Sequence, residues 1–222
     1  MLLLAFDTAT PAVTVALHDG AQVLAERTTV DGRRQGELLA PHIAEVLADA
    51  GAASADLTHI AVGVGPGPFT GLRVGVVTAR VMAQALGIPV GGVCTLDALA
   101  TEAAEARAVP DAFLVATDAR RREVHWAAYE LGPNGHPIRT DGPHVAAPAD
   151  VVVSGRPVVG RGADLYAEWL GPRVGPVDPG AGFLAGLAVR ELAAGRPLAE
   201  PIPLYLRRPD AIAPGPPKPV RP

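Results

Sequence analysis

Cysteine is almost absent from this chain, because Cys94 stands alone among 222 residues. One cysteine excludes a disulfide within the chain and any metal site built on cysteine pairs. Histidine offers no substitute, since no two of the six histidines are four residues apart, the spacing that places two ligands on one helix face. We therefore expect no metal site, and we expect Cys94 to be a buried apolar side chain.

Excess positive charge and long apolar runs are also lacking. The 19 Lys and Arg residues are outnumbered by 23 Asp and Glu residues, so the net charge is −4 and nothing favours unaided binding of nucleic acid. The apolar start, Met1 to Phe6, meets Asp7 too early for a signal peptide or a membrane span. The composition indicates a cytoplasmic globular protein that makes no membrane contact.

A buried strand that ends in an aspartate is the first positive signal. Leu2 to Phe6 is a continuous apolar run, Asp7 and Thr8 follow it, and Val13 to Leu17 alternates apolar with polar residues. This pattern predicts a strand, a polar turn and an antiparallel partner strand. Asp7 and Thr8 would then lie at the carboxyl end of a central strand, where open α/β sheets bind ligands.

The stretch from Val62 to Ala85 predicts a strand, a tight turn and a helix. Two glycines and two prolines follow one another from Gly65 to Pro68, and Thr70 is expected to cap the helix. Such a turn can cradle an anion. However, no P-loop lysine follows Gly71, and Gly65, Gly67 and Gly71 do not have the dinucleotide-binding spacing. A packed structural turn and a phosphate site remain alternatives.

The opening pattern recurs in the second half of the chain. Phe113 to Ala116 is again apolar, Thr117 and Asp118 follow it, and an alternating stretch comes next. Such internal similarity predicts a duplicated domain. The layout resembles the actin-like superfamily of actin, Hsp70 and sugar kinases: an α/β fold of two duplicated ribonuclease H-like subdomains, here with the second one reduced. We expect subdomains over residues 1–108 and 109–208, and a proline-rich disordered tail over residues 209–222.

Five segments carry a resemblance to one family, and they occur in that family's order. They are DTAT at 7–10, GPGPFTGLR at 65–73, TLDALA at 95–100, DARRREVHWAAYE at 118–130 and PLYLR at 203–207. The chain resembles the TsaB (YeaZ) family of bacterial tRNA threonylcarbamoyladenosine biosynthesis proteins. Pro68 replaces a serine and Val74 an isoleucine of the family pattern.

The resemblance implies a non-catalytic accessory subunit. Such a subunit binds TsaD as a heterodimer, works with the ATPase TsaE, and supports transfer of the threonylcarbamoyl group from threonylcarbamoyl-AMP to N6 of adenosine 37 in tRNAs that read codons starting with A. Contact with tRNA would be indirect, through the complex. The catalytic paralogue TsaD carries two metal-binding histidines at positions that align with Thr95 and Leu99, so no catalytic residue is assigned here.

The resemblance also implies a partner surface on two helices, expected near residues 35–50 and 72–86, which would pack as a four-helix bundle with the partner. Without that partner, the same apolar strip could pair two copies of the chain. The candidate interface residues are Leu39, Ile43, Val46, Val77, Val81 and Ala85.

An ATP-dependent phosphotransferase is the alternative function. Its nucleotide or phosphate site would use Asp7, Thr8, Asp118 and the loop formed by Gly65, Gly67, Thr70 and Gly71. No cofactor is expected otherwise, and weak binding of ATP or ADP stays open. A peptidase has no nucleophile–base or metal constellation to support it. The run Arg120 to Arg122 is interpreted as a solvated turn.

Overall fold

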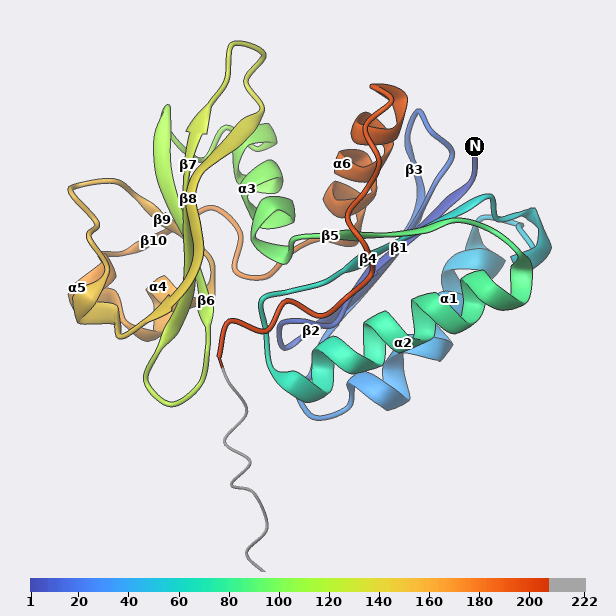
Figure 1. Cartoon of the computed structure of the whole chain (residues 1–222), viewed down its shortest axis with the longest axis horizontal. Helices are drawn as coiled ribbons and strands as arrows, with labels where there is room; N and C mark the ends of the chain where they lie inside the picture. The colour runs from blue at the N-terminus through green and yellow to red at the C-terminus, as the bar shows by residue number, and fades with distance from the viewer. Residues whose placement is uncertain (208–222) are drawn as a thin grey trace, which may run out of the picture.

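The computed structural model describes residues 1–207, which form two α/β lobes side by side (Figure 1). Each lobe is built on one five-stranded sheet. None of the helices in this part of the chain is both long and apolar enough to cross a membrane. The proline-rich tail expected over residues 209–222 lies outside the described residues.

The first sheet combines an antiparallel meander with two parallel strands. Its order is β3-β2-β1-β4-β5, with β1 and β2 antiparallel and β4 and β5 parallel to β1. Every residue of β1 and β2 is buried, as their apolar composition requires. The strands are β1 (Leu3–Asp7), β2 (Ala12–His18), β3 (Val23–Val30), β4 (His59–Gly63) and β5 (Val90–Val93).

The second sheet repeats this topology. Its order, β10-β9-β6-β7-β8, places the lobe's first strand between an antiparallel meander and two parallel strands, as in the first lobe. The predicted duplication is therefore confirmed, and the second copy is reduced because β9 and β10 have two residues each. The strands are β6 (Ala112–Asp118), β7 (Val124–Leu131), β8 (Pro137–Ala146), β9 (Val158–Val159) and β10 (Arg173–Val174).

Helices α1 (Gln35–Asp49) and α2 (Phe69–Leu86) cover the outer face of the first sheet (Figure 1). In the second lobe the short helices α4 (Arg161–Leu165) and α5 (Ala167–Leu170) take the corresponding place. Two 3-10 turns, Ser54–Asp56 and Pro148–Asp150, complete these layers.

The two remaining helices lie between the lobes, and each packs on the sheet of the other half of the chain. Leu96 and Leu99 of α3 (Thr95–Glu105) pack against Phe113 of the second sheet. In return, α6 (Ala181–Ala193) comes from the second half, and its buried residues pack against the first sheet, together with Leu3, Ala5 and Ala61. The lobes are thus interlocked, and a cut near residue 108 separates each sheet from one of its covering helices.

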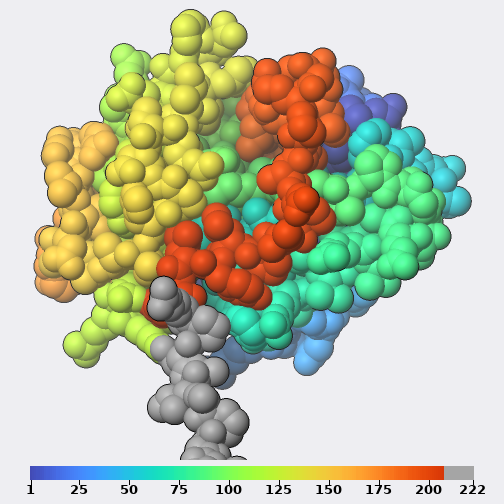
Figure 2. All heavy atoms as spheres, in the orientation of Figure 1, coloured from blue at the N-terminus to red at the C-terminus, as the bar shows by residue number. Residues whose placement is uncertain are grey.

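Residues 197–207, which we call the closing segment, return from α6 along the edge of β5. The backbone N–H of Gly92 donates to the Ala199 carbonyl at 2.7 Å, and the N–H of Leu204 donates to the Val64 carbonyl at 2.8 Å. A Cβ atom at Gly91 would lie only 2.3 Å from the Cβ of Leu198, so glycine permits this approach. Figure 2 shows the segment, in red, running over the surface between the lobes. It covers a strand edge that would otherwise be open.

The interlocked helices predict that residues 1–108 do not fold alone. Without α6, that fragment exposes the apolar face of the first sheet that carries Leu3, Ala5 and Ala61. We expect the fragment to aggregate, whereas residues 1–207 should stay soluble and unfold cooperatively, as measured by circular dichroism and light scattering. A monomeric 1–108 fragment with a cooperative thermal transition would contradict this.

Candidate functional site: the aspartate turn, the glycine-rich loop and the α2 surface

Asp7, at the end of β1, is fully buried and holds three segments together. Its Oδ1 accepts a hydrogen bond from the Ala9 N–H at 2.6 Å, and its Oδ2 accepts one from the Thr95 hydroxyl at 2.6 Å. The Thr95 oxygen in turn accepts from the Gly65 N–H at 3.1 Å. The carboxylate is thus engaged with its own turn and, through Thr95, with the glycine-rich loop after β4.

That loop and the first turns of α2 pack directly on the aspartate turn. The Thr8 hydroxyl donates to the Gly71 carbonyl at 2.7 Å. A Cβ atom at Gly67 would lie 2.2 Å from the Ala9 carbonyl oxygen, and one at Gly71 would lie 2.3 Å from the Thr8 carbonyl oxygen. Glycine is needed for close backbone approach, so the geometry favours the packed turn over the phosphate cradle.

The expected helix cap at Thr70 is wrong, and the hydroxyl of Thr95 caps no helix either. α2 begins at Phe69 with Pro68 as its N-cap and no side-chain cap, which leaves Thr70 exposed within the first turn. Thr95 is the first residue of α3, follows the N-cap Cys94, and makes no capping bond. Its hydroxyl donates to Asp7 instead. A buried carboxylate without a donor costs more free energy than a first helical turn without a side-chain cap.

Asp118, the counterpart of Asp7 in the second lobe, is engaged within its own turn. Its Oδ1 accepts from the Arg120 N–H at 2.7 Å, and its Oδ2 lies 3.2 Å from the Arg120 guanidinium. Between the two aspartate turns there is a void of about 10 Å³, which Asp118 lines and Asp7 does not. The ion pair between Arg161 and Asp178 forms part of its wall. A nucleotide would enter only if the lobes moved apart.

The positions that carry histidines in the metal-binding paralogue have other uses here. Thr95 binds Asp7, and Leu99 is fully buried in the core between α3 and the second sheet. Across residues 1–207, no three His, Cys, Asp or Glu side chains come together in a way that could hold a metal ion.

A larger cavity of about 660 Å³ lies between the lobes, beside α3, β8 and the closing segment. Asp97 is its central polar group: the Tyr129 hydroxyl donates to Asp97 Oδ1 at 2.7 Å, and the Arg139 guanidinium lies 3.4 Å from the same oxygen. Burial raises the pKa of Asp97, and it raises the pKa of the nearby Cys94 thiol to about 12, which keeps that thiol unreactive. Asp97, Tyr129 and Arg139 come from three different elements and no spacing pattern joins them, so the sequence did not indicate this cluster.

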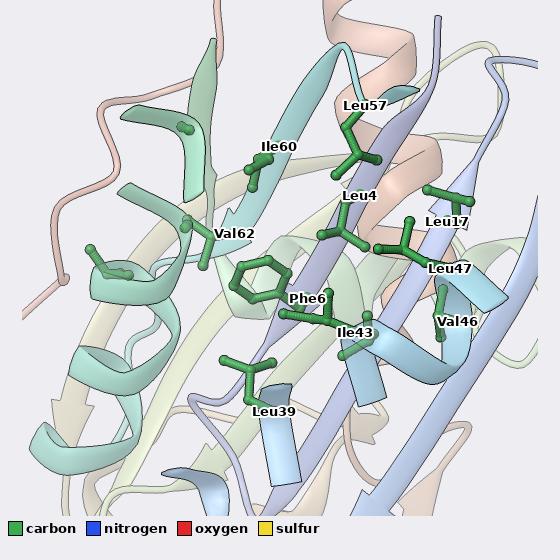
Figure 3. Close-up of a cluster of buried hydrophobic side chains, with 14 of the residues drawn as sticks. Leu4, Phe6, Leu17, Leu39, Ile43, Val46, Leu47, Leu57, Ile60 and Val62 are labelled. Atoms are coloured by element: carbon green, nitrogen blue, oxygen red, sulfur yellow. The ribbon is translucent and has the colours of Figure 1, made fainter. Parts of the chain in front are cut away.

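The expected partner surface is wrong for its three α1 residues. Leu39, Ile43 and Val46 are buried, and they belong to the cluster that contains Leu4 and Phe6 of the first sheet (Figure 3). The sheet face needs large apolar side chains over it, and α1 supplies them.

On α2 the sheet-facing positions are mostly small, and the three other predicted residues lie outside. Gly71, Gly75, Ala79 and Ala83 face inward with Leu72 and Val76. Val77 is 56% exposed, Val81 is 60% exposed, and Ala85 is also exposed. The inward and outward rows of α2 are both apolar, so periodicity alone could not separate them.

The close contact between Gly71 and the aspartate turn predicts that Gly71→Ala is strongly destabilising. The added Cβ meets the Thr8 carbonyl, a backbone atom that cannot move away cheaply. We expect a loss of about 2–4 kcal/mol in the free energy of unfolding, measured with urea. The control is Gly36→Ala on α1, where the added Cβ would lie 4.0 Å from Val74 and alanine favours the helix. Equal stability of the two variants would contradict the packed-turn interpretation.

The buried Asp7 predicts a specific pH dependence of stability. Burial raises its pKa from 3.8 to about 6, although the hydrogen bonds from Thr95 and Ala9 act in the opposite direction. The folded state therefore holds this proton more tightly than the unfolded state, and its contribution to stability falls as pH rises from about 4 to about 6, by on the order of 3 kcal/mol. Asp7→Asn, which cannot ionise, should show a flatter profile in urea unfolding between pH 4 and 7. Parallel profiles for the two proteins would refute this.

Comparison with known proteins places the chain in a family. A family model described as TsaD, tRNA N6-adenosine threonylcarbamoyltransferase, matches residues 22–156. An uncharacterized protein from Mycobacterium tuberculosis is 48% identical over 212 residues, which cover 94% of this chain and 93% of that protein. The Escherichia coli tRNA threonylcarbamoyladenosine biosynthesis protein TsaB is 32% identical over 203 residues, which cover 90% of this chain and 83% of TsaB. The solved structure of YeaZ from Pseudomonas aeruginosa superimposes with a TM-score of 0.80 at 32% identity, covering 92% of this chain and 99% of that chain. The chain belongs to the TsaB (YeaZ) family.

Proposed function

We propose that this chain is a non-catalytic subunit of tRNA threonylcarbamoyladenosine biosynthesis that binds a TsaD-type protein through the outer face of α1 and α2. In that complex, which also uses a TsaE-type ATPase, the threonylcarbamoyl group passes from threonylcarbamoyl-AMP to N6 of adenosine 37 of tRNA. A cytoplasmic location goes with this role. The proposal depends on one observation: α2 of this TsaB-family chain has an exposed row of apolar residues.

The outer face of α1 and α2 carries a row of apolar side chains on α2 and a row of small residues on α1. Val77, Val81 and Ala85 are four residues apart and lie on one side of α2. On α1 one of the exposed rows at the same spacing consists of Gly36, Ala40, Ala44 and Ala48. A Cβ atom at Gly36 would lie 4.0 Å from a methyl group of Val74, so the two helices are neighbours there. Small side chains on α1 let a partner helix approach closely, while the valines of α2 supply apolar area to bury.

The internal geometry supports a subunit without its own chemistry. Asp7 is fully buried and bonded to Ala9 and Thr95, and the void between the aspartate turns measures about 10 Å³. A phosphotransferase would need both aspartate turns open to Mg-ATP. Calorimetric titration with Mg-ATP tests this alternative, because substrate-range affinity would favour it.

Substitution on α2 tests the partner surface. Val81→Asp should weaken binding to the TsaD-type protein of the same organism by at least about 100-fold, since a carboxylate would be buried in an apolar contact. The matched control is Val152→Asp on the second lobe, where the side chain is 67% exposed. Light scattering and titration calorimetry measure the complex. If Val81→Asp binds like the control, α2 is not the partner surface.

Reconstitution tests the role of the subunit. Transfer to an unmodified tRNA transcript should be lost when this chain is omitted, and the chain alone should give none. Transfer activity from this chain in the absence of the TsaD-type protein would overturn the non-catalytic assignment. Pairing of two copies through α2, also disrupted by Val81→Asp, is the expected state when no partner is present.

A further inference from the structure

Arginines from four separate segments gather at one end of the molecule. The connection before α1, the start of α2, the β6–β7 turn and the closing segment all lie at the lower end of Figure 1. A Cβ atom at Gly32 would lie 3.6 Å from the guanidinium of Arg120, which links the first connection to the β6–β7 turn. Arg207 of the closing segment pairs with Glu123, next to that turn. We call this surface the arginine face; it comprises Arg33, Arg34, Arg73, Arg120, Arg122 and Arg207.

The three arginines of the β6–β7 turn adopt a backbone conformation that is unfavourable for residues with a Cβ atom. Arg120, Arg121 and Arg122 have φ angles of 61°, 55° and 62°, so three successive residues are left-handed and none is glycine. This conformation costs roughly 1–2 kcal/mol for each residue with a Cβ atom, and glycine, asparagine or aspartate normally occupies it. The turn keeps this unfavourable conformation although none of its three residues is glycine, asparagine or aspartate. This indicates that the arginine side chains have a function there.

Two exposed aromatic rings adjoin the arginines. Phe69 and Tyr205 are stacked with ring centroids 5.3 Å apart, and they remain 49% and 44% exposed. The Arg73 guanidinium lies 3.9 Å from the centroid of the Phe69 ring, and its Nε donates to the Tyr205 hydroxyl at 3.3 Å. This combination of guanidinium groups and rings is typical of surfaces that bind looped or single-stranded RNA.

The charges of the arginine face are only partly neutralised within the chain. Arg34 pairs with Glu37, Arg120 with Asp118, and Arg207 with Glu123. Within residues 1–207, Arg33, Arg73 and Arg122 form no ion pair with a carboxylate, and all three are exposed. The chain as a whole carries a net charge of −4, so this face is a local exception.

We propose that the arginine face contacts the phosphate backbone of tRNA in the assembled complex. This inference rests on the proposed function, which supplies an RNA substrate. An acidic protein surface could also meet the guanidinium groups, but the exposed aromatic stack beside them favours RNA. Three guanidinium groups without a carboxylate partner give a weak, salt-dependent contact, which fits a chain whose net charge is −4.

The test compares Arg33→Gln, Arg122→Gln and the double variant with Arg107→Gln. Arg107 is a close control because it is also exposed and left-handed, with a φ of 54°, but follows α3 away from the arginine face. Affinity of the complex with the TsaD-type protein for a labelled tRNA transcript is measured by fluorescence anisotropy between 50 and 200 mM salt. We expect the double variant to lose roughly tenfold in affinity and the slope of log K against log salt to shrink by about 1.4–1.8, while Arg107→Gln matches the unmodified chain.

The other outcomes are separable. Unchanged tRNA affinity and salt slope in the double variant overturn the proposal. Weaker binding to the TsaD-type protein with unchanged tRNA affinity also overturns it, and assigns the face to a protein contact. If no complex with the TsaD-type protein forms, the proposed function fails on its own. The arginine face is then judged by cross-linking of tRNA to the chain alone at low salt, where equal yields from the double variant and Arg107→Gln reject it.

Discussion

The link from Asp7 through the Thr95 hydroxyl to the Gly65 N–H is the interaction on which the rest of the structure depends. It joins the first strand, the glycine-rich loop and the first helix between the lobes. A buried carboxylate is tolerated only when donors satisfy it, and here they come from segments almost ninety residues apart in sequence. Because Thr8 and Ala9 also lie in close contact with Gly71 and Gly67, the loop is fixed in place. The position of α2, and so of its exposed apolar row, follows from this packing.

Both aspartate turns of this two-lobed fold are held by hydrogen bonds within the chain. The two aspartate turns face each other in equivalent positions of the repeated sheets, but one is sealed by Thr95 and the other is bonded to Arg120. The ion pair of Arg161 with Asp178 stands where the lobes meet. The two surfaces that we propose as binding sites, the apolar row of α2 and the arginine face, both lie on the outside of the molecule.

Sequence reasoning succeeded where the pattern is local. The aspartate after a buried strand, its recurrence at Asp118 and the strand–turn–helix unit around Gly65 were all readable from hydrophobic runs and turn residues. It failed where packing between distant segments decides which side chains are buried. Leu39, Ile43 and Val46 were placed outside, although only the sheet determines which apolar row of a helix turns inward. The bond of Thr95 to Asp7 and the cluster around Asp97 join residues with no common motif, so no pattern of spacing could have indicated them.

The exchange of helices between the lobes has a consequence for synthesis on the ribosome. The first sheet is complete once β5 ends at Val93, but its inner face stays uncovered until α6, which begins at Ala181, has emerged. At about 5–20 residues per second, that face waits several seconds in the presence of other nascent chains and chaperones. The N-terminal lobe cannot finish folding first, as independent domains do. During synthesis from the N-terminus, folding therefore ends only when α6 docks and both lobes close together.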